Sequence, residues 1–137
     1  GHVFGYTIFN DVSVRAYQRK TNQWTPGKNF DGTGPLGPLV VTADALPPGA
    51  SGLRITTRVN GETRQDSNTS DMIFSTARII AILSEFMTLE PGDVIATGTP
   101  SGVAHAMKPP EWLKAGDRVE VEIEGIGVLS NPVADEA

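Results

Sequence analysis

The sequence predicts one mainly β domain with a single packed helix. Three observations lead to this prediction. Apolar and acidic residues alternate along residues 118–124, an Asn-Gly pair at 60–61 separates two strand-like segments, and only residues 71–86 repeat apolar positions at helical spacing. The 137 residues suit one domain, and no linker divides them. A chain of this length can bury a sizeable core without disulfides.

The first segment with regular character is apolar. Residues 3–9 read as a buried strand that ends at Asp11. Residues 12–20 suit a short helix, which Asp11 or Ser13 can cap. In that helix Arg15, Gln18 and Arg19 would lie near one face.

The middle of the chain is rich in turns. Residues 26–52 contain eleven Gly or Pro, which predicts a long ordered loop with a short strand at 39–42. Asn60-Gly61 is a strong hairpin signal, so residues 53–59 and 62–65 are expected to pair as antiparallel strands.

The second half contains the predicted helix over residues 71–86, which Thr69 or Ser70 can cap. Two units of the form Leu-x-x-Gly-Asp follow it, and each is expected to make a tight turn that leads into a strand. The turns span residues 89–93 and 113–117, and the expected strands span residues 94–97, 118–124 and 128–129.

Charge and composition exclude several classes of function. The net charge of −5 argues against a nucleic-acid partner, and no apolar run is long enough to predict a membrane span. The absence of cysteine excludes disulfides, thiolate zinc sites and iron–sulfur clusters, and it favours a reducing, cytoplasmic location. Residues 1–30 nevertheless carry four basic side chains against one acid, which suits a small anionic ligand or reflects ordinary surface variation.

Few residues suit nucleophilic chemistry. A Ser-His-Asp triad would need His2 or His105, and the Gly-x-Ser-x-Gly motif of many serine hydrolases is absent. His105 is expected to face solvent in a loop. The Gly-rich segment 98–102 lacks the Lys-Ser/Thr pair of a phosphate loop, although residues 97–100 can offer donors to an oxyanion.

One polar cluster is more informative. Asp11, Arg15, Gln18 and Lys28 follow the first predicted strand closely. A carboxylate suits a hard cation such as Mg²⁺, and cationic donors suit the carboxylate of a keto acid. The same residues also have structural interpretations: Asp11 can cap a helix, Arg15 and Gln18 can form a solvated helix face, and Lys28 can be a surface charge.

Longer motifs resemble the fumarylacetoacetate hydrolase family, in family order and over nearly the whole chain. Among them are Gly-Tyr-Thr-Ile-Phe-Asn-Asp-Val-Ser-Val-Arg at 5–15, Trp-Thr-Pro-Gly-Lys-Asn-Phe-Asp at 24–31, and Thr-Gly-Thr-Pro-Ser-Gly-Val at 97–103. Further blocks lie at residues 34–38, 59–65, 71–74, 89–95 and 113–117. The resemblance implies a mixed β-roll or β-sandwich, often dimeric, that binds Mg²⁺ or Mn²⁺ and a small anionic keto-acid substrate.

The resemblance also implies roles for individual residues. Asp11 matches the aspartate that binds the metal. Arg15, Gln18, Lys28 and Thr99 match residues that bind substrate, and Lys28 would also be catalytic by stabilising negative charge or moving a proton. Ala16 replaces the Asp that usually follows the motif arginine.

The family's remaining ligands, a Glu-x-Glu pair, precede the Gly-Tyr strand, and its catalytic His-Glu dyad lies further upstream. Residues 1–10 contain no Asp or Glu. We therefore expect residues 1–137 to correspond to the C-terminal two-thirds of a catalytic domain, and we expect the open sheet edges to associate.

The expected activity is metal-dependent hydrolysis of a C–C bond in an acylpyruvate or a fumarylacetoacetate-like substrate. Two alternatives within the family are isomerisation of 2-hydroxyhepta-2,4-diene-1,7-dioate and decarboxylation of oxaloacetate. An alternative of another class is an inactive fragment or a non-catalytic β-roll module.

Overall fold

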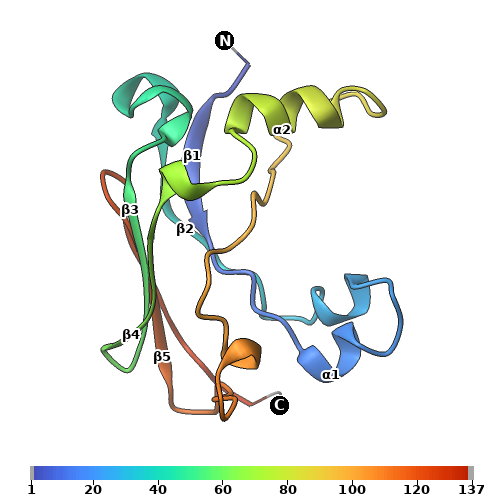
Figure 1. Cartoon of the computed structure of the whole chain (residues 1–137), viewed down its shortest axis with the longest axis vertical. Coiled ribbons are helices and arrows are strands. Elements are labelled where there is room, and N and C mark those ends of the chain that lie inside the picture. The colour runs from blue at the N-terminus through green and yellow to red at the C-terminus, as the bar shows by residue number, and fades with distance from the viewer. Residues whose placement is uncertain (1, 136–137) are drawn as a thin grey trace.

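Two antiparallel sheets form the body of the protein in the computed structural model, which describes residues 2–135 (Figure 1). The smaller sheet pairs β1 (Gly5–Phe9) with β2 (Leu36–Thr42). The larger sheet has the strand order β4-β3-β5-β6. Its strands are β3 (Arg54–Val59), β4 (Glu62–Asn68), β5 (Arg118–Ile123) and β6 (Gly127–Pro132). The predicted mainly β class is confirmed.

Helices are short and lie at opposite ends of the sheets. Helix α2 (Thr76–Leu83) lies near the start of β1, whereas α1 (Arg15–Gln18) projects with its neighbouring loops beyond the other end of β1 (Figure 1). No helix within residues 2–135 is long and apolar enough to cross a membrane.

The core lies where the two sheets face each other. Ile8 on β1 is 1% exposed and packs in one cluster with Val121, Ile126 and Leu129 from the β5–β6 hairpin. Partly buried residues extend this cluster: Tyr6, Val41, Leu46 and Ile123. The alternation predicted along residues 118–124 therefore does separate a packed face from a polar one.

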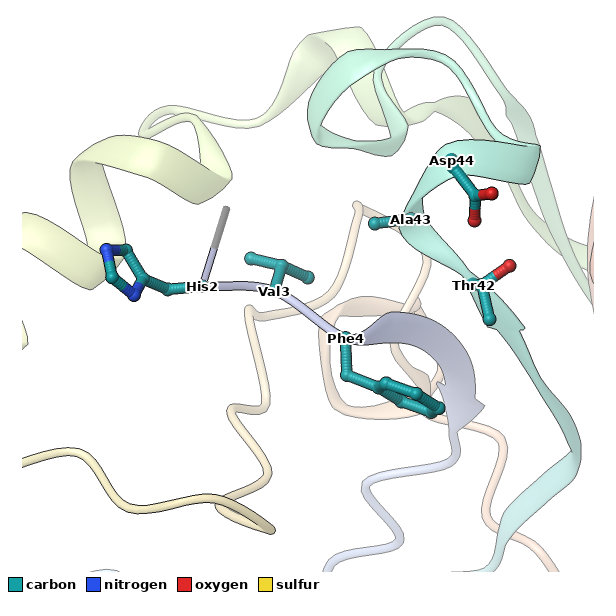
Figure 2. Close-up of a pocket in the computed structure, with 6 residues that line it drawn as sticks. All are labelled: His2, Val3, Phe4, Thr42, Ala43 and Asp44. Carbon is teal, nitrogen blue, oxygen red and sulfur yellow. The ribbon is translucent and has the colours of Figure 1, made fainter.

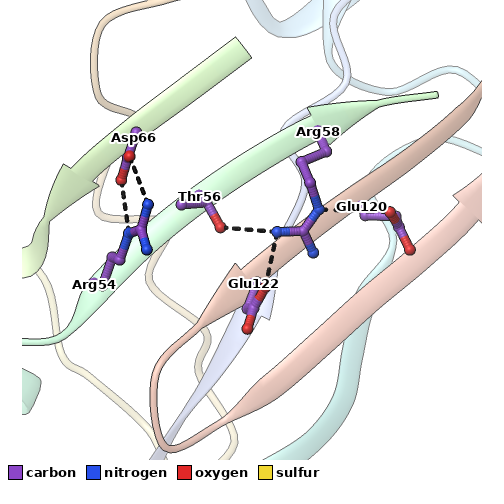
Figure 3. Close-up of polar contacts among 6 residues, drawn as sticks. All are labelled: Arg54, Thr56, Arg58, Asp66, Glu120 and Glu122. Atoms are coloured by element: carbon purple, nitrogen blue, oxygen red, sulfur yellow. Dashed lines mark hydrogen bonds and ion pairs between the residues drawn. The ribbon is translucent and has the colours of Figure 1, made fainter. Parts of the chain in front are cut away.

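The polar face of the larger sheet carries ion pairs between strands (Figure 3). Arg58 on β3 lies 2.8 Å from Glu122 and 3.6 Å from Glu120, both on β5. Arg54 donates two hydrogen bonds to the Asp66 carboxylate on β4, at 2.9 and 2.7 Å. These contacts link neighbouring strands across the exposed surface.

The hairpin prediction is confirmed. Asn60 and Gly61 have φ values of 53° and 83°, the left-handed backbone that a two-residue turn of this kind requires. The paired strands extend to residue 68, beyond the expected end at residue 65.

Both predicted Gly-Asp turns form. In each, the aspartate carboxylate accepts from the backbone N–H three residues earlier, at 2.8 Å for Asp93 and 3.0 Å for Asp117. The glycines before them have φ values of 101° and 91°. The turn at residues 113–117 leads into β5 as expected. The predicted strand at 94–97 is wrong: these residues pair with no strand in the described chain, and Val94 is 65% exposed.

The predicted helix over 71–86 is also too long. Asn68 and Asp71 form a capping box around a separate turn, η4 (Thr69–Asp71), and Met72 then has extended ψ of 130°. The chain starts a new helix only at Ser75, whose hydroxyl accepts from the backbone N–H of Arg78. The capping residues are therefore Asn68 and Ser75, not Thr69 or Ser70.

The N-terminal predictions also need correction. Strand β1 begins two residues later than expected, and β2 begins at Leu36 rather than residue 39. Helix α1 begins after Val14 without any side-chain cap, so neither Asp11 nor Ser13 caps it. The Asp11 carboxylate instead pairs with Lys28.

Candidate functional site

Helix α1 positions two of the predicted substrate-binding residues. Arg15 and Gln18 stand three residues apart, so their side chains meet on one face, and the Arg15 guanidinium donates to Oε1 of Gln18. Gln18 is only 3% exposed. A buried amide needs hydrogen-bond partners, and Arg15 supplies one.

A close backbone contact joins α1 to the turn η1 (Thr25–Gly27), which precedes Lys28. The backbone N–H of Val14 donates to the carbonyl of Gly27 at 2.9 Å. A Cβ atom on Gly27 would lie 2.6 Å from Cα of Gln18, so only glycine allows this approach. The glycine therefore brings the backbone that directly precedes Lys28 against Gln18.

Lys28 and Asp11 form an ion pair, with Nζ and Oδ2 2.5 Å apart. Their side chains are 26% and 44% exposed, so the pair is open to solvent. Asp11 follows the end of β1, and Lys28 follows η1. The structure thus places Asp11, Arg15, Gln18 and Lys28 around the junction of β1, α1 and η1.

Thr99 lies on a different segment. Its hydroxyl accepts a 2.9 Å hydrogen bond from the Gln65 amide on β4, and the same amide donates to the carbonyl of Pro100 at 2.9 Å. Gly102 packs so tightly that a Cβ would lie 2.1 Å from the carbonyl oxygen of Arg64. Within residues 2–135 no hydrogen bond joins Thr99 to Arg15, Gln18 or Lys28, and its part in the site stays a prediction.

The described residues do not complete a metal site. No group of three His, Cys, Asp or Glu side chains between residues 2 and 135 is arranged to hold an ion. Asp11 offers one carboxylate, and its nearest partner is a lysine. The described residues therefore do not fit a metal centre by themselves.

Sequence reasoning missed the environment of His105. This residue lies in the turn η5 (Ala104–Ala106), is half-buried, and contacts the Arg19 guanidinium through Nε2. Its ring stacks on Trp112 with centroids 6.1 Å apart. Partial burial, then the charges of Arg19 and Arg15, lower the pKa of His105. The contact spans 86 residues of sequence, which no local pattern reveals.

Two open pockets border the N-terminal segment, away from this cluster. The larger, of about 550 Å³, is lined by His2, Val3, Phe4, Thr42, Ala43 and Asp44 (Figure 2). The Thr42 hydroxyl lowers the pKa of Asp44, which keeps a negative charge on the pocket wall. The pocket therefore does not suit the anionic ligand for which the sequence argues, and no predicted site residue lines it.

Comparison with known proteins matches residues 1–134 to the family model described as fumarylacetoacetate (FAA) hydrolase C-terminal. An oxaloacetate tautomerase of Bacillus subtilis is 48% identical over 132 residues, which cover 96% of this chain and 44% of that protein. A mitochondrial oxaloacetate tautomerase of Xenopus laevis is 53% identical over 135 residues, which cover 96% of this chain and 42% of that protein.

Solved structures include a similar fold. A fumarylacetoacetate hydrolase from Exiguobacterium antarcticum superposes with a TM-score of 0.94 at 50% identity, over 98% of this chain and 48% of that one. This superposition confirms the predicted fold type. The chain spans less than half the length of each of these three proteins.

Proposed function

The chain belongs to the fumarylacetoacetate hydrolase family, and on this basis we propose that it carries the substrate-binding part of an enzyme that acts on a small 2-oxo acid through its enol or enolate. The observation that carries the proposal is the meeting of Arg15, Gln18 and Lys28 at one junction. A non-catalytic module would have little need for this combination.

The chemistry of these side chains suits an enolate. The guanidinium of Arg15 can donate hydrogen bonds to the carboxylate of a 2-oxo acid, and such charge-assisted bonds are strong. The ammonium of Lys28 can stabilise the negative charge that develops on the 2-oxo oxygen. Gln18, held by Arg15, would keep the guanidinium oriented. Thr99, in the segment at residues 97–103, would also bind the substrate carboxylate. This role stays a prediction.

Tautomerisation of a 2-oxo diacid is the reaction we favour first. Both curated relatives described above are named oxaloacetate tautomerases, and this reaction needs only enolate stabilisation and proton transfer. Cleavage of a C–C bond is the second candidate, because the Exiguobacterium antarcticum structure is titled a fumarylacetoacetate hydrolase. Hydrolysis also needs a base that activates water, and none of Arg15, Gln18 and Lys28 is suited to that task. Isomerisation and decarboxylation stay alternatives through the same enolate.

We propose metal dependence for the whole protein and not for residues 2–135 alone. Asp11 would supply one carboxylate to Mg²⁺ or Mn²⁺, and the other ligands would have to come from outside residues 2–135. A homodimer and a cytoplasmic location also stay predictions, and the Xenopus laevis relative is named mitochondrial.

The test is an assay of the whole protein with oxaloacetate, in which ultraviolet absorbance follows the enol and a coupled assay follows pyruvate. We expect faster enol–ketone interconversion without loss of total oxaloacetate. Formation of pyruvate would indicate decarboxylation, and cleavage of an acylpyruvate in a parallel assay would indicate hydrolysis. If none of these rates exceeds that of buffer, the proposed function is wrong.

A further inference from the structure

We propose that Arg19 and His105 form a second anion-binding subsite beside Arg15, which takes the distal carboxylate of a 2-oxo diacid. The inference rests on the proposed function, because that function places the first carboxylate near Arg15 and Lys28. It adds the residues that hold the second carboxylate of the diacid.

Three elements bring the subsite together. Arg19 directly follows α1 and stands four residues after Arg15, so the two guanidinium groups lie on the same side, with their Cβ atoms about 5–6 Å apart. The turn η5 brings His105 against Arg19. Trp112 stacks on the imidazole at 6.1 Å between centroids, which limits the positions of the ring. One helical turn between the arginines suits the two carboxylates of a short diacid.

The proton on the His105 ring can be assigned from this contact. A guanidinium only donates hydrogen bonds, so Nε2 of His105 must accept from Arg19. The ring is therefore neutral, and its proton lies on Nδ1. Partial burial and the charges of Arg19 and Arg15, which lower the pKa of His105, support this neutral form. His105 therefore positions Arg19 by accepting from it, and the remaining N–H donors of Arg15 and Arg19 have an anion as their natural complement.

The protein itself does not supply that anion. No acidic side chain among residues 2–135 forms an ion pair with Arg15 or Arg19, and the buried Nε of Arg15 has no acceptor. Arg54, Arg58 and Arg64 each contact carboxylates, whereas Arg78 and Arg118 have no ion pair among residues 2–135 but do not stand beside a second arginine on one helix face. Two neighbouring guanidinium groups without a carboxylate partner repel each other, and a bound carboxylate would relieve this repulsion.

The experiment compares two inert 2-hydroxy acids that differ only in the distal carboxylate, malate and lactate. Calorimetric titration of the whole protein in magnesium-containing buffer measures the affinity for each. We expect malate to bind about tenfold more tightly than lactate. Arg19→Gln should remove this advantage and leave lactate binding within about twofold.

Two further variants sharpen the test. His105→Phe keeps an aromatic ring against Trp112 but removes the Nε2 acceptor that positions Arg19, so malate affinity should fall several-fold and lactate affinity should stay the same. Arg78→Gln removes an exposed arginine from α2 and should change neither affinity.

Equal affinity of the unmodified protein for malate and lactate would overturn the inference. So would an equal loss of both affinities in Arg19→Gln, because that pattern indicates a structural role. Malate-selective binding without turnover of any 2-oxo acid would overturn the proposed function and support the subsite. Equal kcat/KM for 2-oxo acids with and without the distal carboxylate would overturn the subsite and support the proposed function.

Discussion

Lys28 reaches back across seventeen residues of sequence to place its Nζ atom 2.5 Å from Oδ2 of Asp11. Both side chains are partly exposed, so water and salt screen the pair and its contribution to stability is about 0–1 kcal/mol. Its importance lies in position. The pair holds the ammonium predicted to be catalytic beside the carboxylate predicted to bind metal.

Replacing Lys28 tests its catalytic role. Lys28→Met in the whole protein should lower kcat by about 10²-fold or more, because it removes a cation that stabilises developing negative charge. Thermal unfolding should change little, and metal binding should be kept. Lys114→Met, an exposed lysine outside the cluster, is the control. Unchanged turnover in Lys28→Met would exclude the catalytic role.

Asp11→Asn tests the metal prediction. We expect the whole protein to bind Mn²⁺, and we expect oxalate, which mimics an enolate, to tighten the binding. The variant should bind at least about tenfold more weakly, since a direct ligand is lost. Titration followed by electron paramagnetic resonance measures both effects. Asp44→Asn, at the open N-terminal pocket, should behave like the unmodified protein, and equal affinity in Asp11→Asn would remove Asp11 from the site.

Gly27→Ala tests the close contact between η1 and α1. The added Cβ would lie 2.6 Å from the backbone of Gln18, so the two segments must separate. We expect a loss of about 1–3 kcal/mol in unfolding free energy, as for other overpacked sites, together with lower turnover. Denaturant unfolding and kcat provide the two measurements. Gly32→Ala adds its Cβ in open space at a φ of 69°, so it should lower stability without lowering turnover.

Gln65→Leu tests whether the Thr99 segment takes part in binding. The Gln65 amide donates to both Thr99 and Pro100, so its loss should loosen this segment. If Thr99 holds a substrate carboxylate, KM should rise several-fold while kcat changes less. Gln23→Leu, at an exposed position before η1, is the control. A KM equal to that of the unmodified protein would argue that Thr99 lies outside the binding site.

Asp117 should make stability dependent on pH. The side-chain amide of Asn60 and then the backbone N–H of Lys114 lower the pKa of Asp117 below its ordinary value. The folded state therefore favours the carboxylate, so this stabilisation is complete above the ordinary pKa and is lost as pH falls through the lowered value. Asp117→Asn should lower the melting temperature by several degrees at neutral pH and by much less in acid. Asp93→Asn, in the equivalent but exposed turn, should have a smaller effect, and a constant difference at every pH would contradict the argument.

Local patterns predicted those parts of the fold that depend on neighbouring residues. The Asn60-Gly61 turn forms because two adjacent residues accept positive φ, and the two Gly-Asp turns form because each aspartate reaches a backbone N–H three residues away. The helix predicted over 71–86 is too long because apolar spacing does not register the capping box that starts a separate turn at Asn68, or the extended backbone of Met72 that ends it.

Contacts between segments that are far apart in the sequence could not be predicted from local patterns. The candidate site residues Arg15, Gln18 and Lys28 were found through their motifs, but the glycine contact that unites them depends on how α1 and η1 fold together. The approach of His105 to Arg19 depends on the path of the chain over 86 residues. A strand at residues 94–97 would need a partner strand beside it, and the sequence alone does not show whether one is there.

The ion pairs on the larger sheet have a consequence for strand alignment during folding. Apolar residues recur at every second position of β5, so a slip of two residues against β3 would keep the same side chains in the core. In one direction that slip would move Arg58 from its place opposite Glu120 to a place opposite Arg118, where like charges repel. Repulsion between surface charges thus disfavours a misaligned pairing that would leave the hydrophobic core unchanged.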